Sequence, residues 1–179
     1  MRLHYFVIVS SAMIAFSTSR AICQSADTTG VSVDGQLTGS FSGWSIGIPG
    51  VGRETFPELF TLGLHWTDAE AYRLGLDFSL GTAPRAFFEG AAVLGLRGGV
   101  ALPMTLGSRV VVLPSGGVSV IAAAGSGFLG AISGFNTGLA VVVLNRSRGL
   151  RTGVTWHWLE EGSEPLWLWE FGFVSLTRP

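Results

Sequence analysis

The sequence predicts an all-β chain in which eight antiparallel strands close into an up-and-down transmembrane barrel. Three observations predict this fold. Apolar and polar residues alternate with a period of two along most of the chain, which places them on opposite faces of a strand. The polar face consists mainly of Gly, Ser and Thr, whereas the apolar face is large and rich in Trp and Phe. A spanning strand takes about 9–11 residues, so eight strands fit a chain of 179 residues.

The composition excludes several other classes of protein. Charged residues make up only 13% of the chain, whereas roughly 25% is usual for a soluble domain. All 11 basic residues are arginines and the formal net charge is −1, so no electrostatic signature of a nucleic-acid partner is present. Cys23 is the only cysteine, so no disulfide forms within the chain. No cluster of residues has the spacing of metal ligands, and we expect neither a metal nor a cofactor.

Residues 1–23 have the pattern of a cleaved signal peptide. The segment starts with the basic Arg2, continues with an apolar stretch over 5–16 and ends in the small-x-small tripeptide 21–23. A retained membrane anchor is the alternative, but the apolar stretch is shorter than the about 20 residues that a spanning helix needs. The segment therefore predicts export. Together with the alternation of the remaining chain, it predicts a barrel domain over residues 24–179 in the outer membrane of a Gram-negative cell envelope.

Eight segments are predicted to be strands; most carry the period-two alternation, whereas 110–123 is apolar on both faces. They cover residues 31–41, 60–67, 72–80, 88–102, 110–123, 134–144, 150–158 and 166–176. Short connections rich in turn-forming residues separate most of these segments, as expected for antiparallel neighbours. The segment 42–58 is predicted to be the one long loop. The glycine-rich segment 125–130 is predicted to be an extracellular loop between the fifth and sixth strands.

The polar face of the strands contains few charges, and we expect them to lie inside the barrel as a structural network. The predicted inward-facing set is Asp34, His65, Arg73, Asp77, Glu89, Arg97, Arg151, His157 and Glu170. Buried charges are tolerable only when they pair. We therefore expect one pair between Arg151 and Glu170 on neighbouring strands, and another between Arg73 and Asp77 on one strand. Because side chains fill the interior of an eight-stranded barrel, the sequence predicts a closed polar core rather than an open pore.

Several of these segments resemble strands of a known family. The segment RVVVLPSGGVSVIAAAG (109–125) resembles the fifth strand of small outer-membrane barrels of the OmpA/OmpX type. The segment GFNTGLAVVV (134–143) is similar to their sixth strand, and LRTGVTWHWL (150–159) to their seventh. The last segment resembles theirs in its alternating aromatic residues but continues with VSLTRP.

The resemblance implies an outer-membrane protein with a structural or surface-interaction role, a polar interior filled by side chains, and no catalysis. Its partners would be outer-membrane lipid and, through the 42–58 loop, a molecule at the cell surface. That loop contains Trp44, Ile46, Ile48, Val51 and Phe56. These apolar residues either mark a contact surface or fold over the mouth of the barrel. We expect the barrel to be a monomer.

The glycine-rich segment 125–130 also allows other interpretations. Its sequence, GSGFLG, matches the G-x-G-x-x-G pattern of dinucleotide-binding folds. Such a fold needs a helix after the glycines, but Gly134 and Gly138 would each cost about 1 kcal/mol relative to alanine in that helix. The same uncharged region contains a G-x-x-x-G series, typical of packed membrane helices. Pro114 and the many valines favour strands over a helical hairpin.

A lipid-modifying enzyme is one alternative function. Some eight-stranded outer-membrane barrels belong to this class, including a deacylase that uses a His-x-Ser pair and an acid. A serine nucleophile needs a base within hydrogen-bond reach. His65 is followed at the second position by Thr67, and His157 by Leu159, so neither supplies that pattern.

A soluble periplasmic barrel of the lipocalin kind is the other alternative. Its apolar residues would face inward around an apolar ligand and its polar residues would face water. The period of two does not by itself say which face is inside. The absence of lysine and the many Trp residues on the apolar face favour the membrane barrel.

Overall fold

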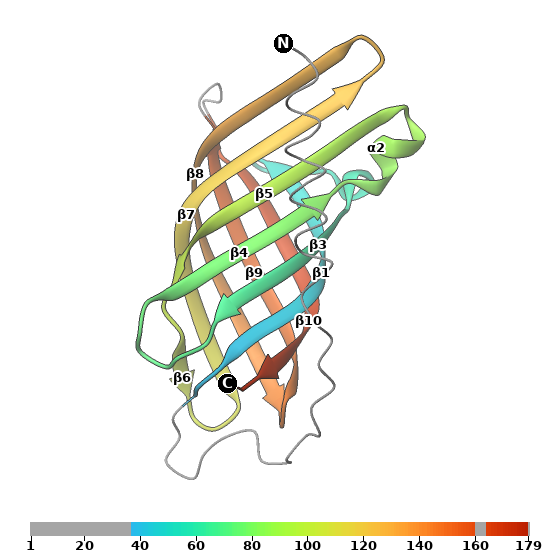
Figure 1. Cartoon of the computed structure of the whole chain (residues 1–179). Helices are drawn as coiled ribbons and strands as arrows, with labels where there is room; N and C mark the ends of the chain where they lie inside the picture. The colour runs from blue at the N-terminus through green and yellow to red at the C-terminus, as the bar shows by residue number, and fades with distance from the viewer. Residues whose placement is uncertain (1–36, 160–163, 179) are drawn as a thin grey trace.

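The computed structural model describes residues 37–159 and 164–178. These residues form a closed antiparallel β-barrel (Figure 1). Eight long strands follow one another around the wall in chain order, and the last strand pairs with the first. The predicted eight-stranded up-and-down barrel is therefore confirmed. The segment 1–23, predicted to be a signal peptide, lies outside the described residues, as does Asp34.

The wall and its connections have the following bounds. The eight long strands are β1 (Ser40–Val51), β3 (Thr61–Asp68), β4 (Gly75–Thr82), β5 (Ala91–Ala101), β7 (Val110–Gly125), β8 (Phe128–Asn145), β9 (Arg148–Leu159) and β10 (Leu166–Thr177). Short elements in the connections are β2 (Glu54–Thr55), the 3-10 helix η1 (Pro57–Leu59), α2 (Pro84–Phe88) and β6 (Met104–Leu106). In the described part of the chain, neither helix has the length and hydropathy needed to cross a membrane.

The barrel has two different ends. We call the end where β1 begins and β10 finishes the terminal end (Figure 1). Because neighbouring strands are antiparallel, the connections β3–β4, β5–β7 and β8–β9 also lie there. The opposite end, which we call the loop end, carries η1, α2 and the turn between β7 and β8. The β7–β8 hairpin extends beyond the other strands at the loop end (Figure 1).

The first strand of the barrel differs from the prediction. The segment 42–58 was expected to be a loop, but most of it belongs to β1, which runs from Ser40 to Val51. Its glycines resemble loop residues in the sequence, yet they fit the wall, because a side chain on Gly43 would collide with the carbonyl oxygen of Phe173 on β10. Glycine is therefore required at this position of the contact between β1 and β10. The strand predicted over 31–41 falls mostly outside the described residues.

The glycine-rich segment 125–130 forms a tight hairpin turn. Gly125 ends β7 and faces Phe128, which begins β8. Ser126 and Gly127 lie between them, and Gly127 has a φ of +89°, a left-handed conformation that glycine adopts without steric cost. The expected loop is thus reduced to two residues. Because the chain continues as a strand and not a helix, neither the dinucleotide-binding nor the helical-hairpin interpretation applies.

An apolar core fills the barrel at the terminal end. Its buried residues are Leu37, Phe41, Ala69, Val111, Leu113, Ala140, Val142, Leu144, Val174 and Leu176. The prediction of a polar interior is wrong at this end. The segment 110–113 is apolar on both faces, so its inward side chains are as apolar as its outward ones. Val111 lies opposite Val142 in the register of β7 and β8, and both are buried.

The outer surface of the wall is apolar over its whole height. Leu64 on β3, Val118 on β7 and Phe173 on β10 are all more than half exposed. Aromatic residues face each other on neighbouring strands near both ends. Trp66 and Phe78 stack with ring centroids 6.1 Å apart near the terminal end. At the loop end Trp158 lies opposite Phe135.

Candidate functional site

A layer of buried polar side chains crosses the barrel between the apolar core and the loop end. We call it the polar belt. It consists of Ser45, His65, Thr67, Asp77, Arg97, Ser119, Asn136, Arg151, Thr155, His157 and Glu170. The belt contains two arginines and two carboxylates, so its fixed charges balance. Six of the nine residues predicted to face the interior belong to it.

One ion pair of the belt joins β9 to β10. Nη1 of Arg151 donates to Oε2 of Glu170 at 3.0 Å, so the contact expected between these residues is present. The other carboxylate oxygen, Oε1, lies 3.5 Å from Nε2 of His65 on β3. Arg151 and Glu170 are at least 94% buried, which makes the loss of either partner costly.

The second ion pair of the belt involves Arg97 on β5. Its Nη2 lies 3.3 Å from Oδ2 of Asp77 on β4, and its Nη1 donates to Oγ1 of Thr155 at 2.6 Å. Oδ1 of Asp77 accepts a hydrogen bond from Thr67 at 2.6 Å. The predicted partner of Asp77 was Arg73, and that prediction is wrong.

Two residues predicted to face the interior lie on the surface instead. Arg73 belongs to the turn between β3 and β4, where it forms an exposed ion pair with Glu70 at 2.6 Å. Glu89 directly follows α2 and pairs with Arg85 at 2.9 Å, also in an exposed position. The alternation of the sequence continues through both places, but the strands do not. β4 begins at Gly75 and β5 at Ala91, so the side chains before them are not directed by a strand.

Ser45 contacts His65, and His65 contacts Glu170, which is the order of a serine nucleophile, its base and an acid. Oγ of Ser45 lies 2.5 Å from Nε2 of His65, the same nitrogen that faces Glu170. The other ring nitrogen, Nδ1, lies 3.3 Å from Nη1 of Arg151. Nε2 lies 3.4 Å from the same Nη1, so the contact with Arg151 does not assign the ring proton to one nitrogen. Because one nitrogen faces both Ser45 and Glu170, the acid does not hold the opposite ring nitrogen as the acid of a catalytic triad does.

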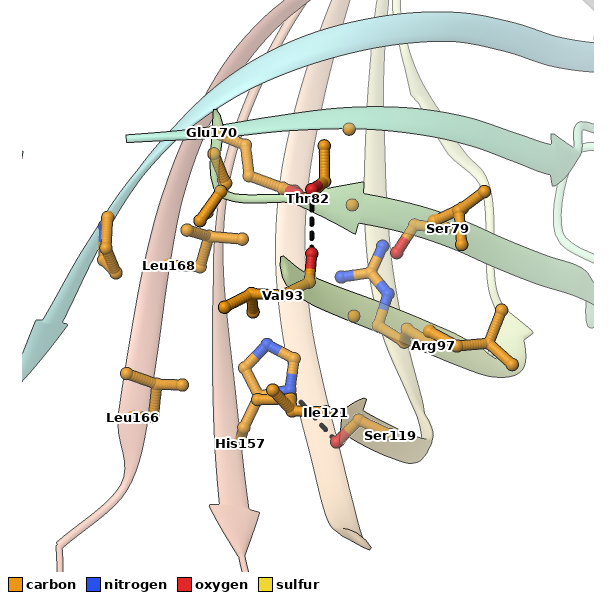
Figure 2. Close-up of a pocket in the computed structure, with 18 of the residues that line it drawn as sticks. Ser79, Thr82, Val93, Arg97, Ser119, Ile121, His157, Leu166, Leu168 and Glu170 are labelled. Atoms are coloured by element: carbon orange, nitrogen blue, oxygen red, sulfur yellow. Dashed lines mark hydrogen bonds between the residues drawn. The ribbon is translucent and has the colours of Figure 1, made fainter. Parts of the chain in front are cut away.

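A cavity of about 260 Å³ separates the polar belt from the loop end (Figure 2). Belt residues that border it include Arg97, Ser119 and His157. The other walls are mainly apolar, with Leu59, Ala86, Val93, Ile121, Leu166 and Leu168 among the lining residues. Since Leu59 belongs to η1 and Ala86 to α2, both short helices border the cavity. Among the described residues, no three His, Cys, Asp or Glu side chains are grouped as metal ligands would be.

Comparisons with known proteins identify the fold but no relative in sequence. No protein-family model and no curated protein matches the chain. The crystal structure of Ail, the attachment invasion locus protein of Yersinia pestis, gives a TM-score of 0.51 at 11% identity, over 78% of this chain and 99% of Ail. The N-terminal β-barrel domain of Pseudomonas aeruginosa OprF gives 0.57 at 10% identity, over 77% of this chain and 97% of that one. The chain has the fold of the small eight-stranded outer-membrane barrels.

A third known structure is similar to the chain in the same way. Neisserial surface protein A gives a TM-score of 0.51 at 8% identity, over 77% of this chain and 96% of its own. The resemblance to small outer-membrane barrels drawn from the strand patterns is therefore confirmed for the fold. Identities this low carry no information about activity, so the function has to come from the barrel's own residues.

Several polar residues of this outer-membrane-type barrel escaped the sequence prediction. Ser45, Ser119, Asn136 and Thr155 belong to the belt, but they are uncharged. In the sequence they are indistinguishable from the many other small polar residues on inward faces. Ser45 was missed for a second reason, because it lies in the segment 42–58, which was assigned to a loop. Its alternation with Trp44 and Ile46 is the signal that could have placed it.

Proposed function

We propose that the protein is an integral barrel of the outer membrane with a structural or surface-interaction role and no catalysis. The observation that carries this proposal is the apolar outer surface of a closed wall. In hydrocarbon every backbone N–H and C=O needs a partner, and a closed sheet supplies one to each strand. In water the same surface would expose an apolar area far larger than the patches found on soluble monomers. Lipid is therefore the partner that fits the outside of the barrel.

The positions of the aromatic residues support the same proposal. Trp and Tyr prefer the interface between hydrocarbon and water, and membrane barrels carry an aromatic girdle at each interface. Trp66 and Phe78 lie near the terminal end, and Trp158 and Phe135 near the loop end. Their positions near the two ends of the wall agree with one girdle at each interface.

The interior supports a structural role. The apolar core occupies the terminal end and the polar belt crosses the middle of the barrel, so the cavity ends at the belt. We expect no ion conductance when the protein is reconstituted into planar bilayers. Stepwise current at neutral pH would contradict a filled interior.

A surface partner, if the protein has one, would bind at the loop end. The segment 42–58 was expected to present this surface, but its first ten residues belong to β1. The loop end instead exposes apolar side chains on α2 and at the tip of the β7–β8 hairpin. Phe87, Phe88, Phe128 and Leu129 are all more than half exposed there.

Membrane location and barrel closure are tested together on cells that express the full chain. We expect the protein in the outer-membrane fraction, with different electrophoretic mobilities before and after boiling in detergent, because a closed barrel resists unfolding at room temperature. Protein in the soluble periplasmic fraction with a single mobility would contradict the proposal. A soluble ligand-binding barrel would then be the better interpretation.

A further inference from the structure

The cavity between the polar belt and the loop end combines apolar walls with a guanidinium group. Val93, Ile121 and Leu168 come from three different strands and face the same space (Figure 2). Arg97 extends from β5 into this space (Figure 2). An apolar pocket with a few convergent polar groups is the usual form of a small-molecule site.

The hydrogen bonding of Arg97 is incomplete. Its side chain is about nineteen-twentieths buried, and Nη1 donates to Thr155. Among the described residues, neither Nε nor Nη2 has a hydrogen-bond acceptor, although Nη2 lies near Asp77. Leaving a buried donor without an acceptor costs stability. In the part of the chain that the structure describes, Nε of this guanidinium thus has no partner, and Nη2 has only the ion pair with Asp77.

His157 adds a second polar group on the same side of the cavity. Its Nδ1 lies 3.1 Å from Oγ of Ser119. The other ring nitrogen points away from Ser119, into the space bordered by Val93 (Figure 2). Arg97 and His157 therefore both border a region whose other walls are mainly apolar, with His65, Ser119 and Glu170 on its polar side.

We propose that this cavity binds a small amphipathic carboxylate, with the carboxylate on Arg97 and the hydrocarbon part against Val93, Ile121 and Leu168. The planar fork of a guanidinium matches the two oxygens of a carboxylate. The volume corresponds to about nine water molecules of liquid, so it admits a short acyl chain or a single ring but not a phospholipid. This inference goes beyond the proposed function, which gives the interior a structural role only.

The test uses the full-length barrel in lipid nanodiscs, labelled with ¹⁵N-arginine, and hexanoate as the probe. We expect a saturable shift of the Arg97 Nε–H resonance, and magnetisation transfer from the hexanoate methylenes to the methyl groups of Ile121. Partition of hexanoate into the bilayer would produce neither signal. Absence of a saturable shift would overturn the proposal, whereas the outcome of the fractionation, which tests the membrane location, does not depend on it.

A matched pair of substitutions on β7 separates the cavity from the outer surface. Ile121→Trp fills the cavity, and we expect it to weaken hexanoate binding at least about tenfold. Val118→Trp places the same side chain on the outward face of the same strand, where Val118 is 56% exposed, and should leave binding unchanged. Equal effects of the two substitutions would overturn the assignment of the cavity.

A double substitution tests the role of Arg97 without leaving a buried charge unpaired. Arg97→Gln combined with Asp77→Asn removes both members of the ion pair. We expect hexanoate to bind about tenfold more weakly or worse, since hydrogen bonds to charged groups are stronger than neutral ones. Binding of hexan-1-ol should change little. Equal affinities of the unaltered barrel for hexanoate and hexan-1-ol would overturn the assignment of Arg97 as the carboxylate site.

Discussion

Replacement of Arg151 by leucine is expected to lower the free energy of unfolding by about 3–5 kcal/mol, because it leaves the carboxylate of Glu170 buried without its partner. Glu170 is only 4% exposed, and its Oε2 receives the 3.0 Å hydrogen bond from Arg151. His65 contacts the other carboxylate oxygen at the longer distance of 3.5 Å, so it does not replace the lost bond. Unfolding by urea in detergent micelles, followed by tryptophan fluorescence, measures the difference.

Two further variants distinguish an unpaired charge from general damage to the barrel. Arg151→Met combined with Glu170→Gln removes both charges and should recover much of the lost stability, as replacement of whole buried pairs often does. Arg73→Leu removes an arginine from the exposed pair with Glu70, and its unfolding midpoint should not change. If Arg151→Leu also left the midpoint unchanged, the contact with Glu170 would make no contribution to stability.

The alternation of the sequence is sufficient to place strands whose two faces differ strongly. The segment 60–67 predicts β3 and the segment 150–158 predicts β9, and each bound differs from the structure by at most two residues. Both segments combine large apolar side chains with small polar ones. β1 is harder to predict because glycine and proline are common in turns as well as at positions where neighbouring strands pack closely. Whether the glycines of β1 belong to a turn or to a close strand contact can be decided only when the partner strand β10 is known.

Contacts between interior charges depend on strand register, which the sequence does not specify. Asp77 lies opposite Gly99 and Arg97 opposite Ser79, so the two side chains meet diagonally across β4 and β5. A shift of one residue would turn either side chain to the outer face. Arg73 is close to Asp77 in sequence, but it precedes the strand and does not reach the interior. Charge content thus predicts that pairs exist, and register decides which residues form them.

The cavity could not be predicted for a related reason. Its apolar lining residues Val93, Ile121 and Leu168 come from strands whose inward faces also carry glycine, serine or glutamate. In the sequence each of them is an apolar residue on an otherwise polar inward face, and no pattern connects the three positions. Only the closed sheet brings them to the same height, above Arg97. The inward face therefore changes from apolar to polar and back to apolar along the barrel axis, which a simple division into two faces does not capture.

Replacement of Leu64 by arginine is expected to destabilise the barrel by about 1–3 kcal/mol in lipid vesicles, because an arginine on the lipid face costs about 2–4 kcal/mol at the bilayer midplane and at most about 1 kcal/mol near an interface. Leu64 lies in the middle of β3, and its side chain is 59% exposed on the outer surface. The side chain lies on the outer face of the wall, opposite to the polar belt, so a loss of stability reports on what surrounds the barrel. Urea unfolding from vesicles gives the value.

The same substitution at Leu74 is the matched control. Leu74 is 71% exposed, but it lies in the turn before β4, at the terminal end. Near the interface an arginine costs at most about 1 kcal/mol, so Leu74→Arg should have the smaller effect. In a soluble barrel both side chains would face water, and exposed substitutions there usually change stability by no more than about 0.5 kcal/mol. Equal, small effects at the two positions would contradict the membrane-spanning barrel, because only a hydrocarbon layer makes the middle of the wall differ from its end.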